Sequence, residues 1–278
     1  MTTFNPLTKH FRQPSIFLKL PSRGKFYPEG SINLPASGEL AVYPMTIKDE
    51  ILLKTPDALM NGEGMSSMIS SCCPSIVSPW DIPLVDLDAI LIAIRLASYG
   101  NAMDINSKCA HCQEPNEHTI DLRVVLDNLN AITKYNTAIE LNGLLFNLKP
   151  QTYKDLNQSG KITFEQQRLL SVVTNSELSE EDKRAQFQEI FNSLTNMNIN
   201  TLVTCITSIV TEDGTAVSDP ELITEFLNKA DRKTYDGVKE IISEAVGANV
   251  IDPVEVECTE CKQKYKVKLE FNPTTFFG

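Results

Sequence analysis

Residues 107–118 read SKCAHCQEPNEH and residues 256–267 read VECTECKQKYKV, and each stretch holds a Cys-x-x-Cys pair between strand-forming residues. A Cys-x-x-Cys pair at the tip of a β-hairpin directs two thiolates to one side. Two such tips supply four sulfur ligands, the tetrahedral set that Zn²⁺ prefers in structural sites. The pairs are 145 residues apart, much more than the 15–20 residues typical of a four-cysteine zinc site. A metal site therefore requires a fold that brings the two tips together.

An internal repeat supplies such a fold. LAVYPMTIKDEI (residues 40–51) and FNLKPQTYKDLN (residues 146–157) match at a constant offset of 106. The identical pairs are Pro44 and Pro150, Thr46 and Thr152, Lys48 and Lys154, and Asp49 and Asp155. In each copy the Pro-x-Thr predicts the start of a helix, with the threonine hydroxyl capping free backbone N–H groups.

The segments that precede the matched residues also correspond. Residues 31–43 and residues 137–149 both predict strand, turn, strand, and Asn142-Gly143 is a strong hairpin signal. Each copy continues into helices and ends in a Cys-x-x-Cys hairpin, where the offset has grown to 149. The second copy thus carries about 43 extra residues, which we place in the helical run of residues 162–249.

We therefore predict an α+β fold made by tandem duplication of a unit that consists of a hairpin, a helical block and a Cys-x-x-Cys hairpin. The predicted parts are an N-terminal arm (1–29), a first repeat (30–125), a second repeat with a helical insertion (126–271) and a C-terminal tail (272–278). The helix from about Asp86 to Tyr99, ended by Gly100, should correspond to a helix around Ile199–Val210. The alternative is two unrelated α+β segments that share common turn chemistry.

Duplication would place the two cysteine pairs around a pseudo-two-fold axis, where one zinc could clamp both copies. The predicted ligands are Cys109, Cys112, Cys258 and Cys261. Because sulfur would fill all four positions, no position remains for water, and the metal would be structural rather than catalytic. The alternatives are a redox pair, incidental cysteines, or a smaller site that includes His111 or His118. The other cysteines (Cys72, Cys73 and Cys205) are interpreted as small buried hydrophobic residues.

Composition narrows the possible partners. The formal net charge of −11 over 278 residues argues against generic binding to DNA, RNA or anionic membranes, all of which are negatively charged. The sequence has no uninterrupted apolar run of about 18 residues, and its first residues lack the apolar core of a signal peptide. We expect a reducing cytoplasm, in which paired Cys-x-x-Cys motifs favour metal over disulfides.

Signals for catalysis are absent from the sequence. It contains no GxxxxGK[ST], HExxH, GxSxG or GxGxxG motif, and its three histidines leave few general bases. We predict no catalytic residues and no small-molecule substrate. Alternate residues from Lys262 to Lys268 are lysines, which would all face one way on a strand. This pattern is typical of a solvated edge strand, and the alternative is a zinc-ribbon protein that contacts nucleic acid through these lysines.

The chain ends on FNPTTFFG, which has three phenylalanines and no obvious element of its own to pack in. Apolar terminal segments usually dock on the body of the protein or on a neighbouring subunit. We predict that Phe271, Phe276 and Phe277 anchor the tail to a partner protein. The alternative is that these rings cover the chain's own zinc hairpin.

Several motifs together resemble a known family. LPSRGKFYP (20–28), YPMTIKDEILL (43–53), CCPSI (72–76) and DLDAILIAIRLASYG (86–100), followed by a Cys-x-x-Cys, are similar to the baseplate hub and hub-assembly proteins of T4-type contractile-tailed phages. The clear resemblance covers about residues 15–125, and the second half is related through the internal repeat. The resemblance implies a late structural or assembly protein of the central baseplate hub in the phage tail. It also implies assembly in the host cytoplasm, other hub or tail proteins as partners, and no catalytic residues to transfer.

Overall fold

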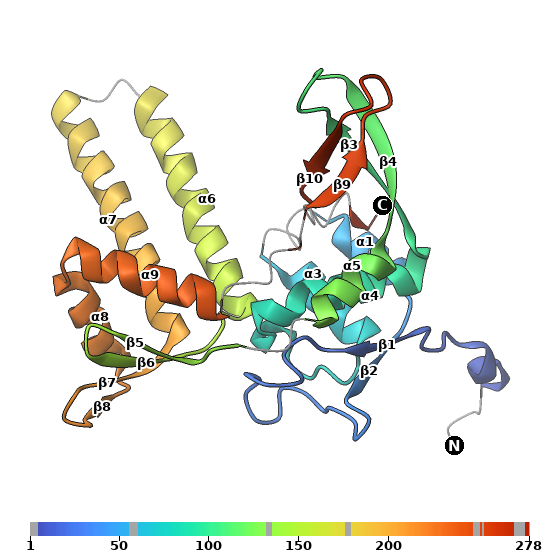
Figure 1. Ribbon diagram of the computed structural model, residues 1–278, viewed down its shortest axis with the longest axis horizontal. Helices are drawn as coiled ribbons and strands as arrows, with labels where there is room; N and C mark the ends of the chain where they lie inside the picture. Colours follow the sequence, from blue (N-terminus) through green and yellow to red (C-terminus); the bar gives the residue numbers. More distant parts are fainter. Residues whose placement is uncertain are drawn as a thin grey trace. The chain divides into compact units, whose positions relative to one another are not determined.

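The computed structural model of the chain describes residues 5–55, 61–131, 135–175, 179–246, 251, 253–269 and 276–277. Helices and short strands are mixed along the chain, so the fold is α+β (Figure 1). The chain forms two compact units. Unit 1 comprises Met1–Pro79, Asp86–Thr133 and Asn249–Gly278, and unit 2 comprises Trp80–Val85 and Lys134–Ala248. The second Cys-x-x-Cys hairpin therefore belongs to the same unit as the first.

Unit 1 contains three antiparallel strand pairs and four α-helices among its described residues. Its elements in chain order are η1 (Pro6–His10), β1 (Ile16–Lys19), β2 (Glu39–Val42), α1 (Ile47–Leu53), α3 (Glu63–Cys72), α4 (Leu84–Tyr99), β3 (Ala102–Lys108), β4 (Pro115–Asp121), α5 (Leu122–Ala131), β9 (Val254–Glu257) and β10 (Lys264–Val267). α4 begins at the end of the unit 2 segment Trp80–Val85. β3 pairs with β4, and β9 pairs with β10.

Helix α4 forms the centre of unit 1. Ile90, Ile92 and Ile94 are fully buried, as expected for a helix that is apolar on almost every side. The helix ends at Gly100, which adopts a positive φ of 85° and donates its N–H to the carbonyl of Leu96. Glycine tolerates this left-handed conformation because it has no Cβ. The predicted helix and its glycine end are thus confirmed.

The predicted hairpin at residues 31–43 is wrong in its first strand. β2 pairs with β1, which lies in the segment that the sequence assigned to an arm, and Ile32 forms only an isolated bridge with Ile76. In β1 and β2, Leu18, Leu40 and Val42 are buried. Residues 31–35 offer a weaker strand because Pro35 has no N–H to donate to a partner.

Unit 2 is built on a four-stranded antiparallel sheet in the order β5-β6-β7-β8. Its elements are η2 (Pro79–Asp81, which begins at the boundary with unit 1), β5 (Ala138–Leu141), β6 (Leu144–Leu148), α6 (Tyr153–Asn175), α7 (Glu180–Cys205), β7 (Ile206–Val210), β8 (Ala216–Val217), α8 (Pro220–Lys229) and α9 (Arg232–Val246). Asn142 and Gly143 have positive φ values of 51° and 75° in the turn between β5 and β6, so the predicted Asn-Gly hairpin is confirmed.

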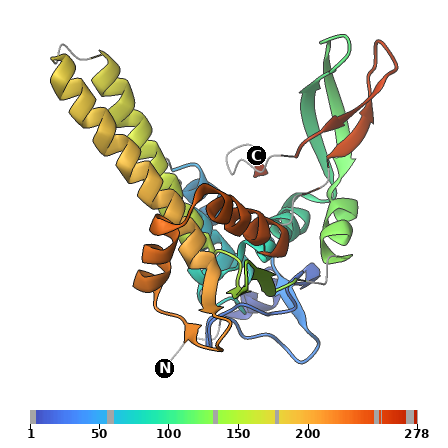
Figure 2. The ribbon, with the colours of Figure 1, turned by 60° about the vertical axis from the view of Figure 1, so that its left-hand side comes forward.

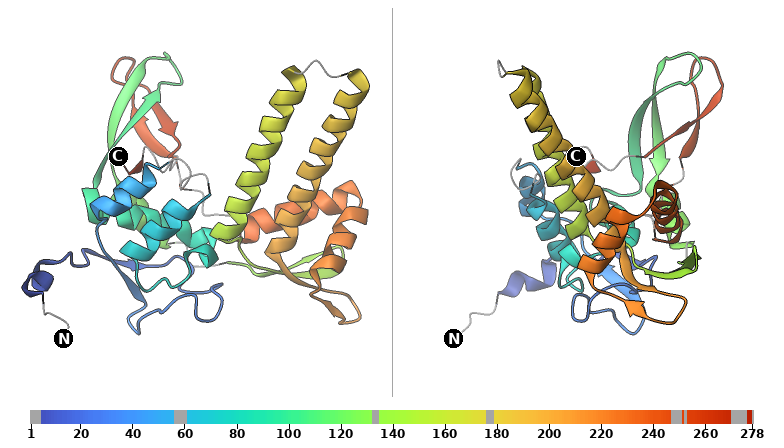
Figure 3. Two further views of the ribbon diagram at one scale, coloured as in Figure 1. Left: turned by 180° about the vertical axis from the view of Figure 1, so that it is seen from behind. Right: turned by 90° about the vertical axis from the view of Figure 1, so that its left-hand side faces the viewer.

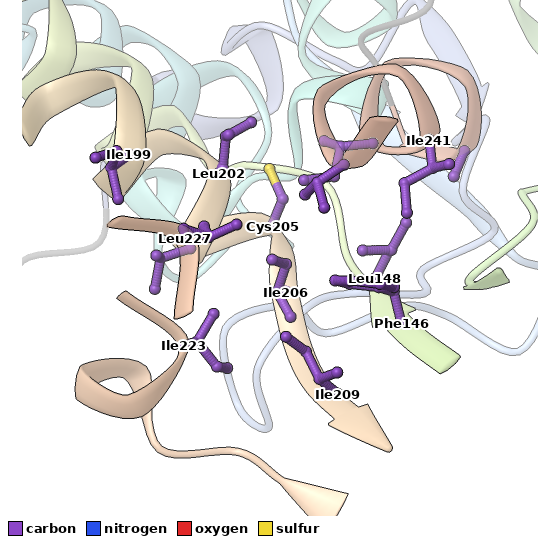
Figure 4. Close-up of a cluster of buried hydrophobic side chains, with 14 residues drawn as sticks. Phe146, Leu148, Ile199, Leu202, Cys205, Ile206, Ile209, Ile223, Leu227 and Ile241 are labelled. Carbon is purple, nitrogen blue, oxygen red and sulfur yellow. The ribbon is translucent and has the colours of Figure 1, made fainter. Parts of the chain in front are cut away.

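Figure 4 shows the core of unit 2, where the sheet meets its helices. Phe146 from β6 and Ile209 from β7 pack in one cluster with Ile223 of α8 and Ile241 of α9. α6 and α7 run beside each other as a long helical hairpin that reaches beyond this core (Figures 2 and 3). Among the described residues, no helix is both long and apolar enough to cross a membrane.

The predicted correspondence between the helix at Asp86–Tyr99 and residues Ile199–Val210 is also wrong. Residues 199–205 are the last turns of α7, and Ile206–Val210 is strand β7. The helix that precedes the second Cys-x-x-Cys hairpin is α9, just as α4 precedes the first. A short apolar run with β-branched residues is compatible with both helix and strand, and here pairing with β6 decides for strand.

Candidate metal centre

The first Cys-x-x-Cys forms the tip of the β3–β4 hairpin, which we call the first ribbon. The backbone N–H of Cys109 donates to the carbonyl of Glu114 over 3.0 Å, and the N–H of Gln113 donates to the carbonyl of Cys109 over 3.0 Å. Gln113 adopts a positive φ of 63°, which closes the turn. The N–H of His111 lies 3.4 Å from Sγ of Cys109, within hydrogen-bond reach. This knuckle fixes the direction of the Cys109 thiol.

The second Cys-x-x-Cys repeats this geometry at the tip of the β9–β10 hairpin, the second ribbon. The N–H of Cys258 donates to the carbonyl of Gln263 over 3.0 Å, and the N–H of Lys262 donates to the carbonyl of Cys258 over 3.2 Å. Lys262 has a positive φ of 58°. Each of these residues lies 149 positions after its counterpart in the first knuckle, so the two tips are equivalent in backbone conformation as well as in sequence.

The four thiols of the two knuckles meet in one cluster. Sγ of Cys109 lies 3.7 Å from Sγ of Cys261, and Sγ of Cys112 lies 3.6 Å from Sγ of Cys258. All four sulfur atoms lie within 4.8 Å of one another. Four sulfurs bound to one Zn²⁺ at about 2.3 Å would be about 3.8 Å apart in a regular tetrahedron. The donor type, number and spacing therefore fit one zinc ion that is shared by both ribbons.

Burial differs among the four cysteines. Cys109 and Cys258 are completely buried, Cys261 is partly buried and Cys112 is exposed. The cluster thus has a closed side toward the ribbons and an open side toward solvent, from which a metal could enter. Its group of possible ligand atoms contains no histidine, which favours the shared four-cysteine site over a smaller site with His111 or His118.

The electrostatics of the cluster favour thiolate formation at one position. A hydrogen bond from the backbone N–H of Cys261, together with weaker ones from Glu260, Asn116 and Cys112, lowers the pKa of the Cys258 thiol to about 6. At Cys112, a hydrogen bond from the Glu114 backbone lowers the pKa, but desolvation and the neighbouring thiols raise it to about 12. The opposite shifts fit a hydrogen bond from the Cys112 thiol to the Cys258 thiolate, whose sulfurs lie 3.6 Å apart. The thiolate is the form that binds a metal.

Asn116 links the first ribbon to the second knuckle. Its Nδ2 lies 3.5 Å from Sγ of Cys258, and its Oδ1 accepts hydrogen bonds from the backbone N–H of Thr259 at 2.8 Å and from the Thr259 hydroxyl at 2.9 Å. Asn116 itself is buried. Hydrogen bonds of this kind orient ligands and tune their affinity for a metal.

Tyr265 makes the reciprocal link from the second ribbon. Its hydroxyl lies 2.7 Å from the hydroxyl of Ser107 and 3.1 Å from Nε2 of His118, and its ring packs in a small core with Cys109 and Cys258. Neither Asn116 nor Tyr265 was identified as functional from the sequence. The signal that could have found them is the offset of 149, which makes the two residues equivalent positions of the two ribbons.

The predicted anchors of the C-terminal tail lie on the chain itself where the structure describes them. Phe276 and Phe277 are only 1% and 4% exposed, and their rings pack edge to face with centroids 4.9 Å apart. Arg95 of α4 donates a hydrogen bond to the carbonyl of Phe276, and the Tyr99 hydroxyl donates to the carbonyl of Phe277 over 2.9 Å. Phe271 lies outside the described residues.

This packing bears on the two hypotheses for the tail, docking on a partner protein and covering of the chain's own hairpin. Arg95 and Tyr99 of α4 donate hydrogen bonds to the carbonyls of Phe276 and Phe277, and Arg95 also lies over the Phe276 ring. The predicted alternative to partner docking was that the rings cover the chain's own Cys-x-x-Cys hairpin. With both rings buried, a partner could reach them only after the tail leaves α4. Docking of Phe271, Phe276 and Phe277 on another protein stays a prediction.

The remaining cysteines are buried and lie outside the cluster. Burial raises the pKa of Cys72 to about 12 and that of Cys205 to about 11, and it also raises the pKa of Cys73. These thiols therefore stay protonated near neutral pH and pack as small apolar side chains. The expectation for all three residues is confirmed.

Comparison with known proteins gives one match. The model of the family described as T4 bacteriophage base plate protein matches residues 14–278, nearly the whole chain. No curated protein and no solved structure matches. The match spans both ribbons, the helical hairpin and the α4 region that carried the resemblance in the sequence. The chain therefore belongs to the T4 bacteriophage base plate protein family.

Proposed function

We propose that this chain is a structural or assembly component of the central hub of a phage tail baseplate. It acts by docking with other hub or tail proteins, without catalysis, and is assembled in the cytoplasm of the infected bacterium before it joins the tail. The observation that carries the proposal is the match of a baseplate family over residues 14–278, which implies a structural role in the phage tail. The free thiols of the described residues suit a reducing compartment.

A structural zinc is the second part of the proposal. Cys109, Cys112, Cys258 and Cys261 would hold the ion, and the spacing of their sulfurs supports this assignment. Four thiolates leave no open coordination position for water or substrate, so the metal would supply stability and no Lewis-acid chemistry. Because the ligands come from segments far apart in sequence, the metal would close a very long loop.

The tandem duplication is the third part, and matched backbone details support it. Oδ2 of Asp49 accepts hydrogen bonds from the N–H and the hydroxyl of Thr46, both over 2.7 Å. Oδ2 of Asp155 accepts the same pair from Thr152, over 2.9 and 2.8 Å. The capping box at the start of α1 is thus repeated at the start of α6, at the predicted offset of 106.

A further match relates the ends of the two helical hairpins. The N–H of Tyr43 donates to the carbonyl of Cys72 over 2.8 Å, and the N–H of Lys149 donates to the carbonyl of Cys205 over 2.8 Å. In both copies, the residue that directly follows the second strand of a strand pair (β2 or β6) donates to the carbonyl of the last residue of the second helix. α1–α3 and α6–α7 are therefore the corresponding hairpins, and a large part of the insertion would lengthen the second one. This supports two copies of one unit. Because β1 pairs with β2 as β5 pairs with β6, the first copy would begin in the segment assigned to the arm and not at residue 30.

The test is carried out in the phage that encodes this chain. A nonsense mutation in its gene should leave cells with phage heads but without complete baseplate hubs, and the wild-type gene on a plasmid should restore infectious particles. Mass spectrometry of purified hub intermediates and of finished tails would establish whether the protein is retained. Normal hubs in the mutant, with a defect elsewhere in the particle, would contradict the hub assignment.

A further inference from the structure

The four thiols of the sulfur cluster differ in their access to solvent. Cys112 is exposed and Cys261 is partly exposed, whereas Cys109 and Cys258 are buried. Sγ of Cys112 lies 3.6 Å from Sγ of Cys258, and Sγ of Cys261 lies 3.7 Å from Sγ of Cys109. Each of these contacts therefore joins an accessible thiol of one ribbon to a buried thiol of the other ribbon.

Contacts outside the cluster also hold the two ribbons together. Asn116 of the first ribbon accepts two hydrogen bonds from Thr259 of the second, over 2.8 and 2.9 Å. The Tyr265 hydroxyl of the second ribbon lies 2.7 Å from the hydroxyl of Ser107 and 3.1 Å from Nε2 of His118 on the first. These contacts do not use the cysteines, so they hold opposing sulfurs near each other independently of a metal ion.

The sulfur spacing is close to what a disulfide requires. The two sulfurs of a disulfide are about 2.05 Å apart, so each pair that faces across the ribbons would have to close by about 1.6 Å. Such a bond would join the ribbons covalently. The competing product is a disulfide within one Cys-x-x-Cys, because all four sulfurs lie within 4.8 Å of one another.

The proposed function takes the chain through two redox environments. A tail protein is made in the cytoplasm, where thiols stay reduced, and the finished particle leaves the cell for an oxidising medium. Peroxides attack accessible thiolates and convert them to sulfenic acids. A sulfenic acid with a second cysteine beside it forms a disulfide, which reductants reverse, instead of the irreversible sulfinic acid. Cys112 and Cys258 have this arrangement.

We propose that peroxide oxidation of the cluster replaces the shared zinc by two disulfides between the ribbons, Cys112–Cys258 and Cys109–Cys261. The inference rests on the zinc site proposed above and identifies how that site is regulated. Zinc joins the ribbons in the reducing cell, and covalent bonds between the same residues join them outside it. The ribbons thus stay together in a medium where the thiolates that hold the metal are exposed to oxidation.

Each disulfide consumes one molecule of hydrogen peroxide. The Cys112 thiolate attacks one peroxide oxygen, the O–O bond breaks, and hydroxide leaves, so that Cys112 becomes a sulfenic acid. The Cys258 thiolate then attacks the Cys112 sulfur, the S–O bond breaks, and a second hydroxide leaves as the disulfide forms. Two protons convert the hydroxides to water. Cys261 and Cys109 react in the same way with a second peroxide, and the sulfurs, no longer thiolates, cease to be metal ligands.

The test uses the full-length protein, purified without chelator and first analysed for zinc. Hydrogen peroxide is added in known amounts after the reductant is removed, and a chromophoric chelator follows the release of zinc. Thiols counted in denaturant should fall from seven to the three buried ones outside the cluster, Cys72, Cys73 and Cys205. Dithiothreitol with added zinc should restore the starting state.

Trypsin distinguishes the possible disulfides once free thiols are alkylated. Cleavage after lysine and arginine gives one peptide of residues 109–123, with both cysteines of the first ribbon, and one of residues 240–262, with both cysteines of the second. Disulfides between the ribbons yield these two peptides as one linked species. Disulfides within each Cys-x-x-Cys yield two separate peptides. Mass spectrometry of the unreduced digest therefore gives the answer on the wild type, without a variant that could fail to fold.

Paired variants then test which sulfurs join. Cys109→Ser with Cys261→Ser keeps Cys112 and Cys258, the pair 3.6 Å apart. Cys109→Ser with Cys258→Ser keeps Cys112 and Cys261 and is the matched control. Under the same peroxide, the first variant should form its disulfide severalfold faster than the control. Equal rates would contradict the assigned pairing.

The expected result is a linked species that forms as zinc leaves and disappears with dithiothreitol. The oxidised protein should also keep its unfolding midpoint in EDTA, whereas the midpoint of the reduced protein should fall when EDTA removes the metal. Separate peptides, zinc retained in excess peroxide, or sulfinic acid at Cys112 would overturn the inference and leave the zinc site standing. Reduced protein that contains no zinc would instead refute the zinc site on which the inference rests.

Discussion

Asn116 of the first ribbon directs its Nδ2 toward Sγ of Cys258 on the second ribbon, over 3.5 Å. The same side chain accepts two hydrogen bonds from Thr259. One amide thus contacts a predicted metal ligand that lies 142 residues away in sequence. This contact gives the sulfur cluster a partner beyond its four cysteines.

Replacing Asn116 by alanine should weaken zinc binding about 10- to 100-fold, which is the usual effect of removing a hydrogen-bond partner of a metal ligand. Replacement by aspartate should weaken it further, because a carboxylate cannot donate to sulfur and adds negative charge beside the thiolates. Competition with a chromophoric chelator measures the affinity. Asn106→Ala, on the exposed face of the same ribbon, is the matched control. Equal affinities for all four proteins would remove Asn116 from the site.

The metal itself gives a second prediction. Protein purified without chelator should contain one zinc per chain by elemental analysis, and Cys112→Ser should lose it. The free energy of unfolding should fall in that variant, because binding to the folded state alone contributes to stability. Cys205→Ala should keep its zinc, since Cys205 lies at the end of α7 in unit 2. Two zinc ions per chain, or none, would contradict the shared site.

A buried carboxyl gives a third prediction, on pH. Burial raises the pKa of Asp86 from 3.8 to about 6, although hydrogen bonds from Ser22, over 2.5 Å to its hydroxyl and 2.7 Å to its N–H, oppose the shift. Between about pH 4 and pH 6 the folded chain therefore holds more protons on Asp86 than the unfolded chain. The contribution of Asp86 to the free energy of unfolding falls as pH rises through this window and is constant above it. A shift of about two units corresponds to about 3 kcal/mol.

Asp86→Asn should remove this contribution. Relative to Asp86→Asn, the wild type should lose about 3 kcal/mol of unfolding free energy as the pH rises from about 4 to 7. Ser22→Ala should move the window upward, because the ionised carboxylate loses the hydrogen bond from the Ser22 hydroxyl and keeps only the one from the backbone N–H. Denaturant titrations at a series of pH values measure both effects. Burial raises the pKa of Asp88 to about 6 as well. Because Asp88 is present in both proteins, subtracting the stability curve of Asp86→Asn from that of the wild type isolates the effect of Asp86. A difference that does not vary with pH would refute the shift at Asp86.

The sulfur cluster could be predicted because its signals are local. Each Cys-x-x-Cys determines its own knuckle, and the offset of 149 relates the two tips without knowledge of the chain between them. The capping boxes at Thr46 and Thr152 were predictable for the same reason. In each, the threonine hydroxyl accepts from the backbone N–H of the aspartate three residues later, and the aspartate carboxylate accepts from the backbone N–H of the threonine.

Features that depend on distant pairing could not be predicted in this way. The partner of β2 is β1 rather than residues 31–35, and nothing in the turn between them specifies that choice. The junction at Cys205 and Ile206, where α7 becomes β7, lies inside an apolar run that suits either structure. The contact of the tail with Arg95 and Tyr99 could likewise not be predicted from local sequence, because it joins residues about 180 positions apart.

The tail gives the last prediction. Phe276 is fully buried and Arg95 lies over its ring, with the guanidinium 5.3 Å from the ring centre. Phe276→Ala should therefore lower the free energy of unfolding by about 3–5 kcal/mol, as expected when a buried phenylalanine is truncated and leaves a cavity. Phe164→Ala on α6, where the ring is 51% exposed, should cost about 0.5 kcal/mol or less. Denaturant unfolding of both variants provides the comparison.

The same variants separate the two roles of the tail in the phage. If Phe276 serves chiefly to hold the tail on α4, its truncation should destabilise the isolated protein, and hub assembly should fall in proportion to the folded fraction. Growth at lower temperature, which favours the folded state, should then restore assembly. If Phe276→Ala leaves the isolated protein as stable as the wild type while hubs still fail to form, the ring acts on a partner, and the seat on α4 contributes little to the fold.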